Sequence, residues 1–144
     1  MIESILLVDD EDLFHLVFED ACSLLDITIS LQSLTSADEA EKKFKHWFDT
    51  NTGKKPECIF VDLNIIGSSF DGIELIRKIN FEYGNGVVIG IISSSDEAEE
   101  QSKAIAAGAQ FWIIKSDDIE PRLEEFKKDY SGYKARTNTF KIYK

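Results

Sequence analysis

The sequence predicts an open α/β fold in which a parallel sheet is covered by helices on both faces. Short apolar runs rich in β-branched residues alternate along the 144 residues with longer segments of helical periodicity. Three of these runs are apolar at nearly every position, which is typical of parallel strands buried on both faces. Because parallel neighbours need right-handed crossover connections, the alternation predicts a doubly wound sheet of five strands with five helices.

The strands are expected at residues 5–8, 27–34, 58–61, 87–92 and 111–114. One helix is expected over residues 12–25. The next begins after Ser36, where Glu39 three residues later completes a capping box, and a third begins at Asp71 in the same way, with Glu74. A fifth follows the last strand.

The fourth helix, starting near Asp96, is unusually poor in large apolar side chains. Its inner face is expected to consist of Ala98, Ala104, Ile105 and Ala106. A helix held by so few large side chains is weakly anchored and shifts easily.

The composition and charge of the chain limit the classes of protein to which it can belong. With 43% apolar and 30% charged residues, the chain can bury a core as one domain. Its net charge of −11 argues against general attraction to nucleic acid or to an anionic membrane. The charge is uneven, because residues 127–144 hold six cations and one anion, a net +5, which leaves −16 on the first 126 residues.

The two cysteines, Cys22 and Cys58, lie in apolar segments without metal-ligand or disulfide spacing, so buried free thiols are expected. No apolar run approaches the roughly 18 residues of a membrane span, and no basic segment followed by a long apolar stretch opens the chain. A soluble, cytoplasmic protein is therefore expected.

The chemistry is expected where the strands end, because ligands of open α/β sheets bind beyond the carboxyl ends of the strands. The first strand ends in Asp9 and Asp10, the third in Asp62, the fourth in Ser93 and the fifth in Lys115. Crowded carboxylates repel one another unless a cation neutralises them, and oxygen ligands suit Mg²⁺. A lysine and a hydroxyl beside them suit a phosphoryl group, so the set predicts phosphoryl transfer to a carboxylate.

These pieces, taken together and in this order, resemble the receiver domain of two-component response regulators. The matching segments are Ile5-Leu-Leu-Val-Asp-Asp-Glu11, Ile59-Phe-Val-Asp-Leu-Asn64, Asp71-Gly72, Ile91-Ile-Ser93 and Gly108-Ala-Gln-Phe-Trp-Ile-Ile-Lys115. The resemblance implies a flavodoxin-like sheet of strand order 2-1-3-4-5. It assigns residues 1–130 to the receiver domain and leaves 131–144 as a basic tail that is either disordered or forms a short added strand.

The resemblance also implies roles for single residues. Asp62 would be the phosphoacceptor, with Lys115 and Ser93 contacting the phosphoryl group. Mg²⁺ would be held by Asp9, Asp10 and Asp62 together with the backbone carbonyl of Asn64. Ser93 and Trp112 would form the conformational switch.

The resemblance implies two kinds of partner. A histidine kinase or a histidine phosphotransfer protein would donate the phosphoryl group, and a downstream protein would be the target. No output domain follows residue 130, so a stand-alone receiver is expected, as a monomer or a weak homodimer. It would be a signalling phosphoacceptor, with only self-catalysed phosphotransfer and dephosphorylation, rather than an enzyme.

The sequence departs from the family pattern at several points. Ser116 follows Lys115 where the family usually has a proline with a cis bond, which leaves the geometry of this peptide open. The loop after Asp62 is about two residues longer than usual and lacks the common proline, so its reach over the site is expected to affect the phosphoryl lifetime. Trp112 is bulkier than the Tyr or Phe that is usual at this position. The stretch between Asp10 and Asp62 is longer than in compact members of the family, and the additional residues are expected within 44–57.

Three alternative functions fit the sequence less well. A pseudo-receiver would keep the fold as an interaction module without phosphorylation, and retention of the whole acidic, hydroxyl and lysine set argues against it. A Mg²⁺-dependent phosphatase and a flavin carrier are disfavoured, since neither the nucleophile-acid arrangement nor a phosphate-binding loop follows the first strand. His15 and His46 are expected to be ordinary solvent-facing residues.

Overall fold

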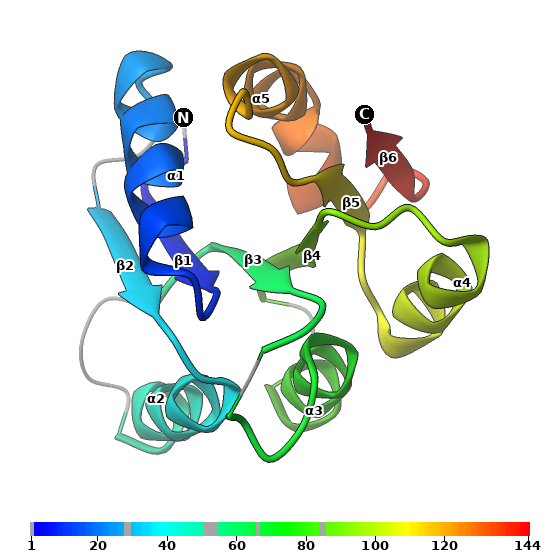
Figure 1. The fold of residues 1–144 in the computed structure, drawn as a ribbon. Helices are drawn as coiled ribbons and strands as arrows, with labels where there is room; N and C mark the ends of the chain where they lie inside the picture. The colour runs from blue at the N-terminus through cyan, green and yellow to red at the C-terminus, as the bar shows by residue number, and fades with distance from the viewer. Residues whose placement is uncertain (1, 28–29, 51–54, 66, 84–85) are drawn as a thin grey trace.

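Six parallel strands form one sheet in the order β2-β1-β3-β4-β5-β6 (Figure 1). The structure is a computed structural model that describes every residue except 1, 28–29, 51–54, 66 and 84–85. The strands are β1 Ser4–Val8, β2 Ser30–Leu34, β3 Cys58–Asp62, β4 Val88–Ser93, β5 Phe111–Ile114 and β6 Lys141–Tyr143. The predicted order of the first five is confirmed, and β6 extends the sheet beyond β5.

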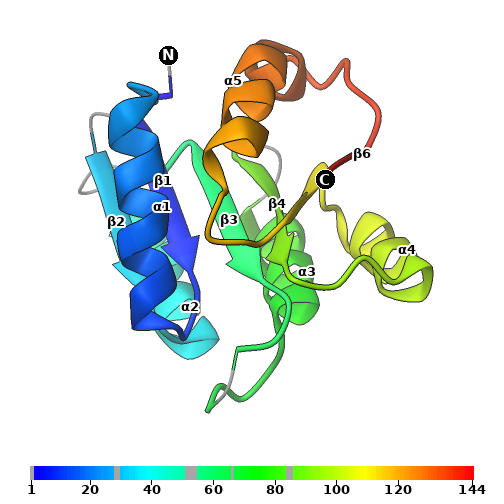
Figure 2. The same ribbon diagram turned by 45° about the horizontal axis from the view of Figure 1, so that its top comes forward.

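In the described part of the chain, five helices cover the two faces of this sheet. They are α1 Asp12–Leu24, α2 Ala37–Thr50, α3 Gly72–Tyr83, α4 Ala98–Ala107 and α5 Glu120–Lys134. Figures 1 and 2 show α1 and α5 on one face and α2, α3 and α4 on the other. This is the doubly wound arrangement expected from right-handed crossovers.

Each face has its own apolar core. Phe44, Ile76 and Trp112 belong to the core beneath α2, α3 and α4, and Phe18, Phe126 and Tyr133 to the one beneath α1 and α5. The strands between them are buried on both sides, as their continuous apolar runs predicted.

Both predicted helix caps are present. The Ser36 hydroxyl accepts a hydrogen bond from the Glu39 amide at 3.1 Å, and an Asp71 carboxylate oxygen accepts one from the Glu74 amide at 2.8 Å. These bonds fix where α2 and α3 begin. Of the expected additional length at 44–57, residues 51–54 lie outside the described part.

The predicted inner face of α4 is partly wrong. Ala104 and Ala107 are buried, whereas Ala98, Ile105 and Ala106 are exposed, Ile105 by 50%. With 3.6 residues per turn, Ile105 and Ala106 turn away from the sheet once Ala104 faces it, and Ala107 returns. The helix therefore contributes only two methyl groups, those of Ala104 and Ala107, to the core.

Helix α5 extends to Lys134, past the boundary expected at residue 130, and the chain then returns to add β6 at the outer edge of β5.

Cys22 and Cys58 are buried and form no disulfide. Among the described residues, none of the helices combines the length and the apolar character that a membrane crossing needs.

Candidate functional site: an acidic cluster at the carboxyl ends of the strands

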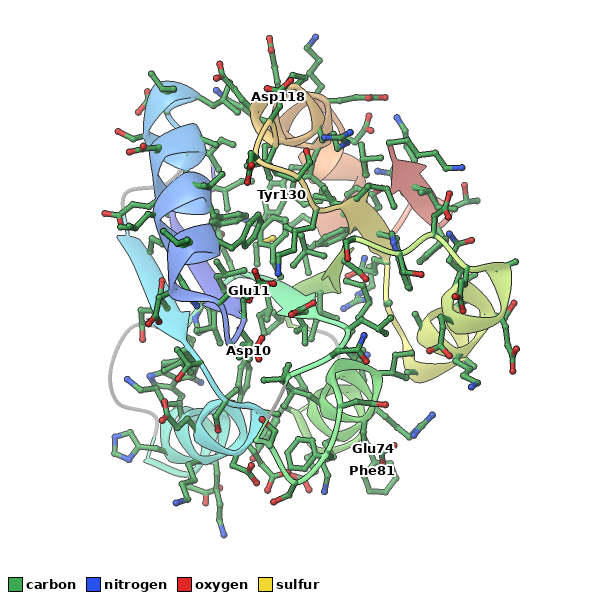
Figure 3. The ribbon with its side chains drawn as sticks, viewed as in Figure 1. Asp10, Glu11, Glu74, Phe81, Asp118 and Tyr130 are labelled. Atoms are coloured by element: carbon green, nitrogen blue, oxygen red, sulfur yellow. The ribbon has the colours of Figure 1, made fainter. Side chains whose placement is uncertain are left out.

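Three carboxylates meet where β1 and β3 end. Oxygen atoms of Asp9, Asp10 and Asp62 lie within 4.8 Å of one another. Asp9 is completely buried and Asp62 is 7% exposed, while Asp10 lies half-buried at the rim. Figure 3 shows Asp10 and Glu11 at the end of β1, facing the end of β3. The parallel register of β1 and β3 produces this convergence, because Val8 pairs with Val61 just before the acidic residues.

Lys115 joins the cluster from the end of β5. Its Nζ lies 2.8 Å from Asp9 Oδ2, 2.6 Å from Glu11 Oε1 and 3.7 Å from Asp62 Oδ2. The Lys115 amide donates to the Ser93 carbonyl at 2.8 Å, which fixes the lysine beside the end of β4. The ammonium thus neutralises part of the negative charge and stands within reach of a group bound to Asp62.

The surroundings of Asp62 disfavour its ionised form. Burial raises the pKa of Asp62 to about 7, and the nearby Asp9 charge adds to the rise while Lys115 opposes it. For Lys115, burial lowers the pKa, but its hydrogen bonds to Asp9 and Glu11 outweigh burial and hold that pKa above the usual value. One ammonium therefore does not balance the carboxylates at this rim.

The residues of the cluster fit a divalent cation. Its donors are carboxylate oxygens, the ligands that Mg²⁺ prefers. Burial and then the Asp9 charge raise the pKa of Asp62, and a dication would relieve the repulsion from Asp9. Asn64, two residues beyond β3, is exposed and lines a polar hollow of about 430 Å³ together with Ser95 and Glu97. The backbone carbonyl of Asn64 remains a predicted ligand.

Ser93 and Trp112 are connected through Ser95. Ser93 is buried at the end of β4, and its hydroxyl accepts a hydrogen bond from the Ser95 amide at 3.2 Å. The Trp112 indole N–H donates to the Ser95 carbonyl at 2.9 Å, and its side chain is fully buried. Trp112 belongs to the same apolar core as Ala104 and Ala107, the buried residues of α4. The bulk of Trp112 is therefore accommodated on the inside.

The long loop after Asp62 is tied to α2. The Ser68 hydroxyl accepts a hydrogen bond from the Ala37 amide at 2.9 Å, and the Ser69 amide donates to Asp38 Oδ2 at 2.9 Å. Ile65 is buried in the core beneath α2 and α3. These contacts hold the described part of the loop against the first turn of α2.

Sequence reasoning assigned no role to Glu11 and misplaced His15. Glu11 pairs with Lys115 across 104 residues of chain, and no local pattern signals such a contact. His15 was expected to face solvent, yet it is 9% exposed, and its Nε2 donates to the Asp9 carbonyl at 2.5 Å. The first turn of α1 lies over the end of β1, so His15 helps to fix the backbone of Asp9.

The peptide bonds between described residues are all trans, including the one between Lys115 and Ser116.

Sequence comparison assigns this arrangement to a family. The profile of the response regulator receiver domain matches residues 5–125. The chain belongs to the response regulator receiver family. No curated protein sequence matches it.

Solved structures with the same fold cover nearly the whole receiver domain. The phosphorylated cyanobacterial phytochrome response regulator RcpA is 18% identical with a TM-score of 0.73, covering 96% of this chain and 98% of its own. A two-component response regulator from Cytophaga hutchinsonii is 25% identical with a TM-score of 0.72, covering 89% and 98%. The Mn²⁺-bound response regulator Rcp1 is 17% identical with a TM-score of 0.69, covering 89% and 94%.

Membership in this family establishes the general function. Receiver domains are phosphoacceptor signalling domains of two-component systems rather than classical enzymes, and phosphorylation and Mg²⁺ binding are general to them. They act between a phosphodonor kinase and downstream targets. The acidic cluster of this receiver domain, formed by Asp9, Asp10 and Asp62, could hold a metal ion.

Proposed function

We propose that this receiver domain accepts a phosphoryl group on Asp62 from a histidine kinase or histidine phosphotransfer protein and thereby switches a protein-binding surface. The observation that supports this most strongly is the geometry around Asp62. Its carboxylate lies at the end of β3, 7% exposed, within 4.8 Å of two further aspartates and 3.7 Å from the Lys115 ammonium.

The reaction requires little beyond positioning and charge neutralisation. An Asp62 oxygen attacks the phosphorus of a phosphohistidine, an O–P bond forms, the N–P bond breaks, and the imidazole leaves with the bonding electrons and takes up a proton. Bound Mg²⁺, held by Asp9, Asp10, Asp62 and the Asn64 carbonyl, would supply positive charge for the phosphoryl oxygens. Lys115 neutralises a further oxygen, and the Ser93 hydroxyl donates a hydrogen bond to another.

Lys115 must change partners for this to happen. In the structure it is engaged by Asp9 and Glu11, and a phosphoryl group adds about −1.5 to −2 charge beside it. Transfer of the ammonium from Glu11 to the phosphoryl group is therefore the expected first response. Movement of Ser93 toward the same group then displaces Ser95, whose carbonyl holds the indole of Trp112.

Incubation with acetyl phosphate and Mg²⁺, followed by measurement of the intact protein mass, tests the proposal. A phosphoryl adduct is expected on the unaltered chain and on an Asp20→Asn variant, which makes the same chemical change on the exposed surface of α1. No adduct is expected on Asp62→Asn.

Two outcomes contradict the proposal. An adduct that persists in Asp62→Asn places the phosphoacceptor elsewhere. The lack of any adduct on the unaltered chain favours a pseudo-receiver, an interaction module that is not phosphorylated. Replacement of Mg²⁺ by a chelator should abolish the adduct, and an adduct that forms equally well with chelator present contradicts the metal assignment.

A further inference from the structure

The basic tail lies against the receiver domain along the outer edge of β5. Strand β6 pairs in parallel with β5, with Trp112 opposite Ile142 and Ile113 opposite Tyr143. Figure 2 shows the tail crossing from the end of α5 to the edge of the sheet on the side of α4. The tail therefore occupies the backbone hydrogen-bonding groups that an edge strand presents to a partner.

Charged and polar contacts hold the tail from both sides. On α5, the Lys141 Nζ lies 2.8 Å from Glu125 and 2.9 Å from Asp129, and the Tyr143 hydroxyl donates to Asp129 at 2.7 Å. The Tyr143 hydroxyl also lies 2.8 Å from that of Tyr133. These bonds to Lys141 and Tyr143 hold the pKa of Asp129 below its usual value. The positive tail thus docks on acidic groups of the domain.

At the other end, the tail contacts the segment that precedes α4. The Lys144 Nζ lies 3.4 Å from Asp96, which directly follows Ser95. Ser95 is the residue whose amide donates to Ser93 and whose carbonyl accepts from Trp112. Through Lys144 and through Trp112, the tail is therefore joined to Ser95 and Asp96, which follow the end of β4 beside the proposed phosphoacceptor Asp62 at the end of β3.

Most of the tail is held by contacts at the surface of the domain. Strand β6 has three residues, and Phe140 and Ile142 are only partly buried against the core, whereas Tyr143 is fully buried and packs against the Phe126 ring. Its ion pairs lie at the surface, where each contributes little on its own. A three-residue edge strand held by one fully buried side chain opens at a smaller free-energy cost than the central strands, which are buried along their whole length.

We propose that β6 is a removable cover of the outer edge of β5, and that phosphorylation of Asp62 releases it and exposes the backbone of that edge. The inference rests on the proposed function, since it takes Asp62 as the phosphoacceptor. Movement of Ser93 toward the phosphoryl group carries Ser95 and Asp96 with it, which separates Asp96 from Lys144 and shifts Trp112 opposite Ile142.

Hydrogen–deuterium exchange of the full chain, with the intact mass recorded on the same sample, tests this. In the phosphorylated sample the amides of Lys141–Tyr143 are expected to exchange about tenfold faster, the size of a typical allosteric coupling. The amides of β1 and β3 should not change. Asp62→Asn, treated in the same way, should keep the slow exchange of β6.

A pair of charge-reversal variants tests whether faster hydrogen–deuterium exchange of the β6 amides reports release of the tail. Lys141→Glu removes the contacts to Glu125 and Asp129, so β6 should exchange fast with or without phosphorylation. Lys128→Glu makes the same change at an exposed position of α5 and should behave as the unaltered chain. Slow exchange of β6 in Lys141→Glu overturns the view that these ion pairs hold the tail.

The remaining outcomes separate this inference from the proposed function. If the adduct forms and β6 exchange is unchanged, the release of the tail is overturned and the phosphoacceptor role of Asp62 stands. If no adduct forms, both are overturned. If the adduct forms and β6 exchange slows, the tail is tightened rather than released, which also overturns the inference.

Discussion

Replacing Asp62 by Asn should stabilise the metal-free receiver domain at alkaline pH. The native pKa of Asp62 is about 7, against an ordinary value of 3.8, because the carboxyl group is buried beside Asp9. At a pH well above 7, keeping it ionised in the folded protein costs up to about 4 kcal/mol. Water at the open rim screens part of this cost, so we expect about 2 kcal/mol of added stability in Asp62→Asn.

The sign of the pH dependence follows from the same pKa. Because it is raised in the folded state, the native protein binds more protons than the unfolded chain between about pH 4 and pH 7, so its stability falls as pH rises through this window. The difference between Asp62→Asn and the unaltered chain should therefore be near zero at about pH 4 and largest at about pH 8.

Urea unfolding in the presence of a chelator, followed by circular dichroism at both pH values, measures this difference. Asp20→Asn, the same change on the exposed surface of α1, serves as control and should alter stability little at either pH. Added Mg²⁺ should stabilise the unaltered chain more than Asp62→Asn, since it binds the folded state through this carboxylate. An Asp62→Asn variant that is no more stable than the unaltered chain at about pH 8 would contradict the raised pKa of Asp62.

Three further predictions concern the surroundings of the site. In Gly72→Ala, the new Cβ would lie 2.0 Å from the Asp62 carbonyl oxygen. We therefore expect the free energy of unfolding in urea to fall by about 1–3 kcal/mol and the phosphoryl adduct to form more slowly. If neither quantity changes, the close approach of Gly72 to Asp62 is contradicted. Ser68→Ala removes the hydroxyl that accepts from the first turn of α2 and should cost about 1 kcal/mol, measured in the same way. Burial raises the pKa of Cys22 to about 12 and that of Cys58 well above its usual value, so both thiols should react with a disulfide reagent at least about a hundredfold more slowly in the native protein than in urea. Rapid native reaction of either thiol would show that the core opens readily.

The sequence was sufficient for the fold because its signals are local and repeated. The buried runs around Ile5, Ile59 and Ile89 can only be satisfied by strands covered on both faces, and the capping residues Ser36 and Asp71 fix where helices begin. The inner face of α4 was predicted only in part, because its local signal is weak. The small residues Ala98, Ala104 and Ala106 are too similar to reveal which side of the helix faces the sheet.

Acidic groups, a hydroxyl and a lysine at the ends of neighbouring strands can be recognised in the sequence, because strand ends are visible as the last residues of apolar runs. Which of these groups contact one another depends on how the elements pack. The fold pairs Lys115 with Glu11, buries His15 against the Asp9 carbonyl, and places β6 beside β5. These contacts join residues whose local sequence carries no record of the partner, since packing between elements rather than spacing along the chain brings them together.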